Sequence, residues 1–367
     1  MTQQPIEVLA VCHALRDNFN VYRPEAAQIS GLHASPRANV TVLCNPGAVT
    51  IPYFEQHGIR VLTEPLDKKL SLRSIARIRS ELRAGNYQIL HLFNNTAISN
   101  GAFAALFTEV KVVAYRGQTG NTSRWDPTSY LSVLHPRIDM VVCVADAVAD
   151  YLRGEQWGKN KAVTVYKGHD TDWYQNAPAD LTGLGLPQDA VVISLIADIR
   201  PRKGLHILVA ATHFFSADSN IHILLVGANA DDARVQEQIA QAANPGRIHA
   251  LGYRTDAPEI SAASDIVVLP TTKREGLSRA VLEGMAYGRP AVVTATGGNA
   301  ELVADKVTGL VVPPNDPKSL AHALNALAGD PELRERYGQA AKQRVVQHFS
   351  VQQGVNKTLD VYETLLQ

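Results

Sequence analysis

The sequence predicts an α/β protein made of two doubly wound halves, each a parallel sheet with helices on its faces. Short apolar runs alternate with amphipathic segments along the chain, which is typical of βαβ units. The alternation breaks in a Gly/Pro-rich stretch at 168–190 and then restarts, which indicates a linker. The length of 367 residues also favours two cores over one. Ligands bind such sheets at the carboxyl ends of the strands, here beside a cleft between the halves.

The first half contains seven expected strands, each a short apolar run: Ile6–Cys12, Asn39–Cys44, Ile59–Leu62, Tyr87–Leu92, Lys111–Tyr115, Asp139–Val144 and Lys161–Tyr166. Helical patterns fill the gaps. In one of them, five apolar side chains recur at helical spacing: Leu70, Leu72, Ile75, Ile78 and Leu82. The second half has six expected strands: Ala190–Ile196, Ile221–Val226, Arg247–Leu251, Asp265–Leu269, Pro290–Ala295 and Gly309–Val312. Three expected helices close the chain: Pro317–Ala328, Pro331–His348 and Val351–Leu366.

Composition narrows the class of protein. Basic and acidic residues both number 35, so no general attraction to nucleic acid is expected. Cys12, Cys44 and Cys143 lie in or beside apolar runs without metal-ligand spacing, which favours buried free thiols in a reducing compartment. Because no secretory signal pattern and no run of roughly 18 apolar residues is found, we expect a cytoplasmic protein. Neither half has a Gly-rich dinucleotide fingerprint or a Walker P-loop.

The most informative stretch is 273–290, which lies between two expected buried strands and therefore contains a crossover helix. Its carboxylates Glu275 and Glu283 would be separated on a helix by ~12 Å of rise. This distance is too long for a shared-proton pair or a glycosidase pair, and it suits two anchor points for one extended ligand. Free N–H groups of Gly276, Leu277 and Ser278 at the helix N-terminus would attract phosphate. A surface helix with two solvated acids is the alternative.

A second signal follows the first strand of the second half. Arg200, Arg202 and Lys203 precede Gly204, which opens a helix. Cations at this edge of a sheet can neutralise a pyrophosphate, and a solvated basic turn is the alternative. The two signals together place a cationic clamp and a helix end flanked by carboxylates at the open edge of one sheet.

These residues are part of a series of segments that resembles the retaining GT-B glycosyltransferases, specifically glycosyltransferase family 4. The resemblance covers about 163–367 and rests on segments in the family's order: Gly168–Tyr174, Arg200–Gly204, Leu251–Asp256, Asp265–Glu283, Gly288–Val303 and Gly309–Asp316. The N-terminal half resembles the family only in its strand pattern. The resemblance implies two Rossmann-like domains facing a cleft, with an acceptor-side domain at 1–170 and a nucleotide-sugar donor domain at 186–345. A C-terminal helix at 346–367 would return to the first domain.

The resemblance also implies roles for single residues. Glu275 would contact the donor sugar, Lys203 the diphosphate, and Glu283 the ribose hydroxyls. The other candidates for donor binding lie on the same loops or on the loop that passes the nucleobase: Gly276, Leu277, Ser278, Arg279, Arg200, Arg202 and Tyr253. The nucleotide-sugar is a substrate, and neither a cofactor nor a metal is expected.

The sequence departs from the family's pattern at three places. Asp198 stands where the family has an arginine, so Arg200 or Arg202 would have to reach the phosphates. No glycine-rich loop follows the first strand, where Arg16–Asn18 stand instead. Arg116 replaces a family histidine and is a catalytic candidate that would contact donor phosphate or sugar, or an anionic acceptor. A purely structural role for Arg116 is the alternative.

Other features have both a structural and a functional interpretation. The acids at 170–172 imitate a metal-binding Asp-x-Asp pair, but a turn or a helix cap suits their place in the linker. His91 and His13 end expected strands and either line the cleft or belong to the core. The polar loop 117–127 contains a tryptophan and is the best candidate for acceptor contact.

The segment 67–83 carries six basic residues and two acids around its apolar stripe. A packed helix with a solvated basic face explains this composition. The alternative is a docking face for an anionic membrane, which would suit a lipid-linked acceptor.

The resemblance therefore predicts a metal-independent retaining glycosyltransferase. It would transfer a hexosyl unit from a UDP- or GDP-linked sugar to a glycan or lipid-linked glycan, in bacterial surface polysaccharide or lipopolysaccharide synthesis. The protein would be cytoplasmic, with peripheral contact at the inner face of the membrane left open. A sugar phosphorylase or epimerase on the same fold is one alternative, and a non-catalytic nucleotide- or glycan-binding protein is another.

Overall fold

The computed structural model describes residues 4–13, 18–154 and 160–367, which form two compact units. Unit 1 consists of Met1–His169 and Phe349–Gln367, and unit 2 of Asp170–His348. The last helix, α13 (Val351–Leu366), therefore belongs to the same unit as the N-terminal half of the chain.

Unit 1 contains a seven-stranded parallel sheet in the order β3-β2-β1-β4-β5-β6-β7. Its strands are β1 (Ile6–Val11), β2 (Ala38–Cys44), β3 (Arg60–Thr63), β4 (Ile89–Leu92), β5 (Lys111–Arg116), β6 (Met140–Cys143) and β7 (Ala162–Thr164). All seven coincide with expected strands, with small shifts at their ends. The prediction succeeds because strands buried on both faces are continuous apolar runs bounded by turn residues.

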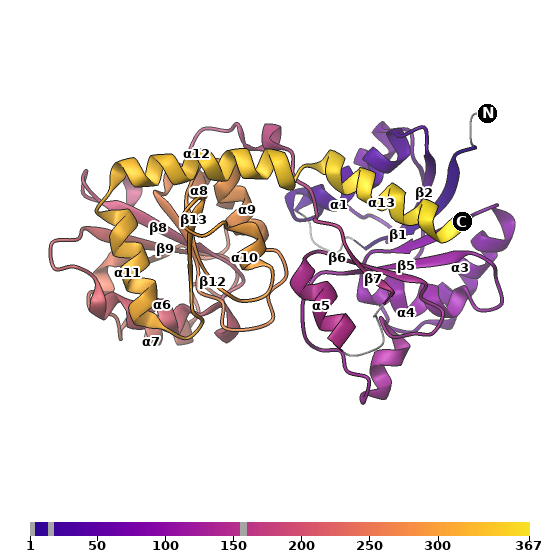
Figure 1. Ribbon diagram of the computed structural model, residues 1–367, viewed down its shortest axis with the longest axis horizontal. Helices are drawn as coiled ribbons and strands as arrows, with labels where there is room; N and C mark the ends of the chain where they lie inside the picture. Colours follow the sequence, from indigo (N-terminus) through magenta and orange to yellow (C-terminus); the bar gives the residue numbers. More distant parts are fainter. Residues whose placement is uncertain (1–3, 14–17, 155–159) are drawn as a thin grey trace. The chain divides into compact units, whose positions relative to one another are not determined.

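Helices cover both faces of this sheet (Figure 1). One face carries α1 (Phe19–Ala34), α2 (Ile51–Gln56) and α13, whose Ile29, Phe54 and Tyr362 join one buried cluster with the strands. The amide of Gln28 in α1 also donates a hydrogen bond of 2.9 Å to Thr358 of α13. On the other face lie α3 (Leu72–Ala84), α4 (Asn95–Ala104) and α5 (Asp146–Gly154). The three cysteines are free and buried, as predicted.

The apolar stripe predicted for α3 is only partly buried. Ile78 and Leu82 are buried, whereas Leu70 and Leu72 are 42% and 86% exposed. The reason is that Ser71 caps the helix by accepting a hydrogen bond from the Ser74 N–H, so Leu70 precedes the helix and Leu72 lies in its first turn.

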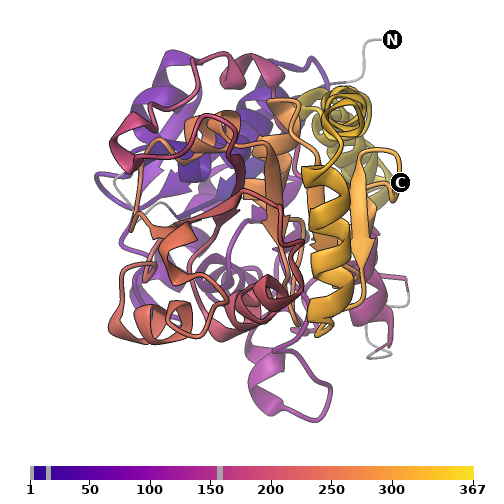
Figure 2. The same ribbon diagram turned by 90° about the vertical axis from the view of Figure 1, so that its left-hand side faces the viewer.

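Unit 2 contains a six-stranded parallel sheet in the order β10-β9-β8-β11-β12-β13. Its strands all coincide with predictions: β8 (Val191–Ile196), β9 (Ile221–Val226), β10 (Ile248–Ala250), β11 (Ile266–Leu269), β12 (Ala291–Thr294) and β13 (Gly309–Val312). One face is covered by α6 (Leu205–Ala211), α7 (Ala233–Ile239) and α11 (Pro317–Ala328), and α11 runs alongside β13 (Figure 2). Against the other face lie α8 (Ala257–Ala263), α9 (Arg279–Ala286) and α10 (Asn299–Leu302). The long helix α12 (Pro331–His348) packs on α9 and α11.

The stretch predicted as a linker is mostly packed against unit 2. Leu181, Leu184 and Leu186 pack against a buried cluster that includes Ile260 of α8. The N–H of Ala179 donates to the Glu259 carbonyl at 3.0 Å. The chain passes from unit 1 to unit 2 between His169 and Asp170, and returns to unit 1 between His348 and Phe349.

Each sheet has one point where the strand order reverses, between β1 and β4 in unit 1 and between β8 and β11 in unit 2. Ligands of doubly wound sheets bind at the carboxyl ends of the strands beside such a point. Across residues 4–13, 18–154 and 160–367, no helix is long and apolar enough to cross a lipid bilayer.

Candidate active site

Three loops meet at the carboxyl edge of the unit 2 sheet, beside its reversal point. They follow the neighbouring strands β8, β11 and β12 and cover 197–204, 270–278 and 295–298. The first and second loops are joined by a hydrogen bond of 2.8 Å from the Thr272 N–H to the Arg202 carbonyl. Gly204 makes this approach possible, since it has a φ of +80° and a Cβ there would lie 1.8 Å from the Pro270 carbonyl oxygen.

The second and third loops are joined in the same way. Gly297 has a φ of +56°, and a Cβ on it would lie 2.1 Å from the Glu275 carbonyl oxygen. The N–H of Gly298 donates to the Gly276 carbonyl at 2.9 Å. The Thr296 hydroxyl donates to the Thr271 carbonyl at 3.0 Å. The backbone around Glu275 is therefore fixed by contacts from a loop about twenty residues further along the chain.

Lys203 and the buried Glu275 form an ion pair with little exposure to solvent where these loops meet. Lys203 Nζ lies 2.7 Å from Glu275 Oε2, and the side chains are 13% and 9% exposed. The Thr271 hydroxyl donates to the same Oε2 at 2.9 Å. Arg202 Nη1 lies 3.9 Å from this oxygen. No described residue donates a hydrogen bond to Glu275 Oε1, so that oxygen is available to a ligand hydroxyl.

The N-terminus of α9 lies between the two predicted carboxylates, as the sequence predicts, but Glu275 is not part of the helix. Ser278 is the N-cap of α9, and its hydroxyl accepts from the Val281 N–H at 3.4 Å. Glu275 therefore lies in the preceding loop, next to Arg274 with a φ of +59°, and the helical-rise estimate for the two acids was wrong. The physical reason is the long-range attachment of this loop to Gly297. Among the described residues, no protein group accepts from the N–H groups of Gly276, Leu277 and Ser278, which leaves them for an anion.

Glu283 lies inside α9 and is 5% exposed. Its Oε1 is 3.3 Å from Arg279 Nε, one helical turn earlier. Burial raises the pKa of Glu283 to about 7, with Arg279 lowering it and Glu259 raising it further. Tyr287 of the following turn packs edge-on against Tyr174 from the segment after His169. A carboxylate in this place can accept hydrogen bonds from two neighbouring hydroxyls.

The basic turn divides into two kinds of arginine. Arg200 is 59% exposed and lies 2.5 Å from Asp198 Oδ2, while Asn229 donates to Asp198 Oδ1 at 3.0 Å. Arg200 is thus paired with Asp198. Arg202, in contrast, lies beside Glu275 and donates to the Arg274 carbonyl at 3.2 Å.

Tyr253 is 55% exposed in the loop after the edge strand β10.

In unit 1, Arg116 is buried and its guanidinium donates to the carbonyls of Gln118 and Gly120. Burial lowers its pKa. These contacts hold the turn that begins the loop 117–127, in which Trp125 is 80% exposed. These contacts are typical of a structural residue. A ligand-binding role for Arg116 stays a prediction.

The histidines and linker acids have structural contacts. His91 Nδ1 lies 2.6 Å from the Tyr362 hydroxyl, and burial lowers its pKa to about 3, so His91 is a neutral core residue. His13 is half-buried at the end of β1, and burial lowers its pKa. Asp170 accepts from the Asp172 N–H at 3.0 Å, the cap geometry that the sequence predicts. Arg16 and Asp17 lie outside the described residues, and Asn18 caps α1.

Sequence reasoning missed the threonines that position Glu275. Thr271 and Thr296 each lie two residues after the end of a strand, β11 and β12, and both are buried. A hydroxyl residue just beyond a buried strand was the available signal.

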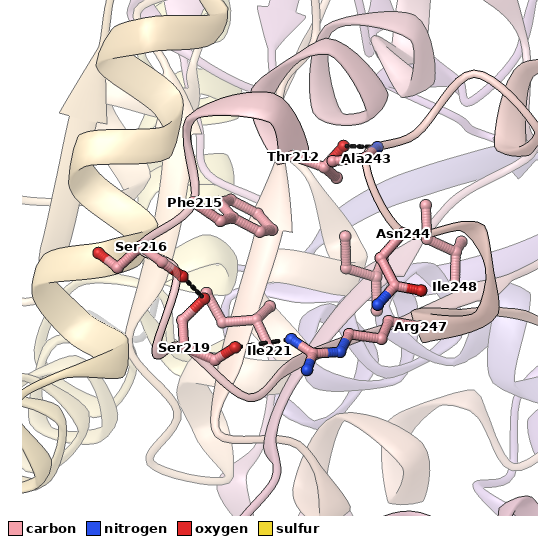
Figure 3. Close-up of a pocket in the computed structure, with 10 residues that line it drawn as sticks. Thr212, Phe215, Ser216, Ser219, Ile221, Ala243, Asn244, Arg247 and Ile248 are labelled. Atoms are coloured by element: carbon pink, nitrogen blue, oxygen red, sulfur yellow. Dashed lines mark hydrogen bonds between the residues drawn. The ribbon is translucent and has the colours of Figure 1, made fainter.

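A separate hollow in unit 2 lies near the start of β9 and β10, away from the carboxyl edge (Figure 3). Phe215, Ile221 and Ile248 line it together with Asn244 and Arg247, which donates to the Ser219 carbonyl at 2.6 Å. Its volume of about 160 Å³ is below the ~300–1,000 Å³ of typical ligand pockets. A nucleotide-sugar is too large for it.

Two family models match the chain, Glycosyltransferase Family 4 over residues 29–173 and Glycosyl transferases group 1 over residues 178–344. The alpha-maltose-1-phosphate synthase of Mycolicibacterium smegmatis is 31% identical over 217 residues, which cover 54% of this chain and 55% of that protein. The phosphatidyl-myo-inositol mannosyltransferase of Mycobacterium leprae is 28% identical over 297 residues, or 79% of this chain and 77% of that protein. The chain thus spans little more than half the length of the first of these relatives.

Among solved structures, Anabaena HepE in complex with UDP and glucose has a TM-score of 0.79 at 20% identity, covering 98% of this chain and all of that one. This likeness shows the fold. The two family models together match most of the chain, and each falls largely on one of the two units. The chain belongs to the GT-B glycosyltransferases of family 4.

Proposed function

We propose that the protein is a metal-independent retaining glycosyltransferase that moves a hexosyl unit from a UDP- or GDP-linked sugar to a glycan or lipid-linked glycan. Its setting would be bacterial surface polysaccharide or lipopolysaccharide synthesis, in the cytoplasm. The observation that carries the proposal is the Lys203–Glu275 pair, 2.7 Å apart, beside the unbonded N–H groups before α9. The three buried free thiols support the compartment, and the UDP and glucose bound to HepE support the class of donor.

In this proposal, each group takes one part of the donor. Glu275 Oε1 accepts a hydroxyl of the donor sugar, and Glu283 accepts the ribose hydroxyls. The N–H groups of Leu277 and Ser278 and the ammonium of Lys203 bind the diphosphate, and Arg202 adds positive charge next to it. The bond between the sugar C1 and the phosphate oxygen breaks while the acceptor oxygen bonds to C1 on the same face. The acceptor proton moves to the leaving phosphate, whose charge the fixed donors stabilise.

The test is a transfer assay with UDP- and GDP-hexoses and an extract of lipid-linked and free glycans. We expect Glu275→Ala to abolish transfer and Lys203→Ala to lower it by at least about tenfold, since each removes stabilisation of charge in the transition state. The control is Lys273→Ala, which removes an exposed lysine of the same loop. Near-normal transfer by both Glu275→Ala and Lys203→Ala would refute the proposal, and sugar release that requires orthophosphate would favour a phosphorylase.

A peripheral contact with an anionic membrane is part of this proposal. Lys68, Lys69 and Arg73 surround the exposed Leu70 and Leu72 at the start of α3. Apolar side chains beside cations are what an anionic lipid surface binds. One relative of this chain is named phosphatidyl-myo-inositol mannosyltransferase, and phosphatidyl-myo-inositol is a lipid.

Vesicle flotation tests this contact. We expect binding to phosphatidylglycerol vesicles and not to phosphatidylcholine vesicles, with a loss in Leu70→Ser/Leu72→Ser. Val307→Ser, which changes an exposed apolar residue of unit 2, is the control. Equal binding to both kinds of vesicle would contradict the membrane contact.

A further inference from the structure

Three buried threonines lie at the carboxyl ends of β11 and β12: Thr271, Thr294 and Thr296. The hydroxyls of Thr294 and Thr296 donate to one acceptor, the carbonyl of Thr271, at 2.5 Å and 3.0 Å. The pairing of the two strands reaches Leu269↔Val293, so Thr294 is the next residue after this pair and the last of β12. The backbone of Thr271 is therefore attached to the end of a core strand.

The side chain of Thr271 makes a second contact, with Glu275. Its hydroxyl donates to Glu275 Oε2 at 2.9 Å, and the same oxygen accepts from Lys203 Nζ at 2.7 Å. Thr271 is fully buried, and a β-branched side chain has few accessible χ1 rotamers. Since its carbonyl is also held, the Thr271 hydroxyl has a fixed position relative to the sheet.

The carboxylate of Glu275 depends on such a fixed partner. The last side-chain torsion of a glutamate is intrinsically broad, because rotation about an sp³–sp² bond has no sharp staggered minima. The ammonium of Lys203 ends a flexible four-carbon stem and can follow a carboxylate that turns. The Thr271 hydroxyl cannot follow it. Thr271 therefore keeps Oε2 beside Lys203, and Oε1 is the oxygen that the proposed function assigns to the donor sugar.

We infer that Thr271 is a positioning residue of the transfer reaction. It acts through Glu275, by holding the carboxylate in the orientation in which Oε1 accepts a hydroxyl of the donor sugar. Thr294 and Thr296 support this orientation through the Thr271 carbonyl. The inference rests on the proposed function, which gives Glu275 its contact with the donor. Loss of the Thr271 hydroxyl should lower turnover and leave the binding of a free nucleotide intact, because UDP and GDP carry no hexosyl unit for Glu275 to bind.

The test compares kcat at saturating donor with the affinity for UDP or GDP in matched variants. Thr271→Val keeps the shape of the side chain and removes its hydroxyl, whereas Thr271→Ser keeps the hydroxyl and removes a methyl group. Thr308→Val is the control. It removes another buried hydroxyl of unit 2, which accepts a hydrogen bond from the Ala304 N–H at 2.9 Å.

We expect Thr271→Val to lower kcat by at least about tenfold, because small misplacements of a positioning group have large effects on rate. Its affinity for the nucleotide, measured by calorimetry, should stay within about twofold of the wild-type value, since Lys203 and the N–H groups before α9 are unchanged. Thr271→Ser should retain most of the turnover, and Thr308→Val should keep the wild-type kcat. Thermal unfolding shows which variants are folded.

A wild-type kcat in Thr271→Val would overturn the inference. A parallel loss of kcat and nucleotide affinity would also overturn it, since that result indicates a general distortion of the loops, and so would an equally large loss of kcat in Thr271→Ser. If Thr271→Val does not fold, Thr294→Val takes its place and should lower kcat by about threefold or more at unchanged nucleotide affinity. A wild-type kcat in Thr294→Val would then overturn the inference. Absence of transfer or of nucleotide binding in the wild-type protein would instead refute the proposed function.

Discussion

Lys203 and Glu275 hold opposite charges 2.7 Å apart with little exposure to water. Removing both charges from water costs free energy that their attraction offsets only in part, so a buried pair adds little stability compared with an apolar one. Glu275 has one bonded and one unbonded oxygen, and the neighbouring N–H groups have no acceptor among the described residues. Ligand binding explains this arrangement better than stability does.

A double-mutant cycle can separate the two explanations. Lys203→Met alone should lower the free energy of unfolding by about 3 kcal/mol, because Glu275 is left buried and uncompensated. Lys203→Met/Glu275→Leu should recover most of that loss but none of the nucleotide binding. Arg254→Met, which breaks an exposed pair with Asp256, should change stability by less than about 1 kcal/mol. Chemical denaturation gives the stabilities, and recovery of nucleotide binding in the double variant would contradict a ligand-binding role for the pair.

Glu283 gives the protein a pH dependence with a defined sign. Burial raises its folded-state pKa to about 7, above that of an unfolded glutamate, so the folded state binds the proton more tightly. This contribution to stability is present at acidic pH and is lost as the pH rises through about 7. The stability difference between wild type and Glu283→Gln should therefore fall with rising pH, by on the order of 2 kcal/mol. If this stability difference does not change with pH, the raised pKa of Glu283 is contradicted.

At the scale of elements, the three loops after β8, β11 and β12 depend on close backbone approaches. Gly204→Ala and Gly297→Ala would each place a Cβ about 2 Å from a carbonyl oxygen, at a positive φ. We expect each to lower the free energy of unfolding by about 2–4 kcal/mol. Gly183→Ala is the control, since a Cβ there meets nothing within 4 Å. Thermal unfolding measures the effect, and wild-type stability in both loop variants would show that the loops are not joined as described.

The same elements show what the sequence can and cannot predict. The thirteen strands were predictable, because their apolar runs are local signals bounded by turn residues. The place of Glu275 outside α9 was not, because it depends on the close backbone approach of Gly297 from another loop and on a hydrogen bond from the Thr271 hydroxyl. The packing of Leu181 and Leu184 on unit 2 was missed for the same reason, since a Gly/Pro-rich stretch resembles a linker until its neighbours are known.

At the scale of the whole molecule, two parallel sheets each present a reversal point, and each carries a different set of groups there. Unit 2 has a cationic and N–H-rich edge with Lys203 and Glu275, which the motifs of the sequence predicted. In unit 1, Asn45 and Glu64 follow β2 and β3 at the same edge, and Glu64 Oε1 lies 3.3 Å from Arg73 Nε. No motif pointed to these residues, because they are far apart in the sequence and meet only through the strand register.

The most direct test of the central claim is titration calorimetry with UDP and GDP. We expect UDP or GDP to bind the wild-type protein and Lys273→Ala with the same affinity. The same nucleotide should bind Lys203→Ala at least about tenfold more weakly, because Lys203 contacts the diphosphate in the proposed site. Equal affinity in Lys203→Ala and the wild-type protein, or binding of neither nucleotide, would contradict the assignment of a donor site to these loops.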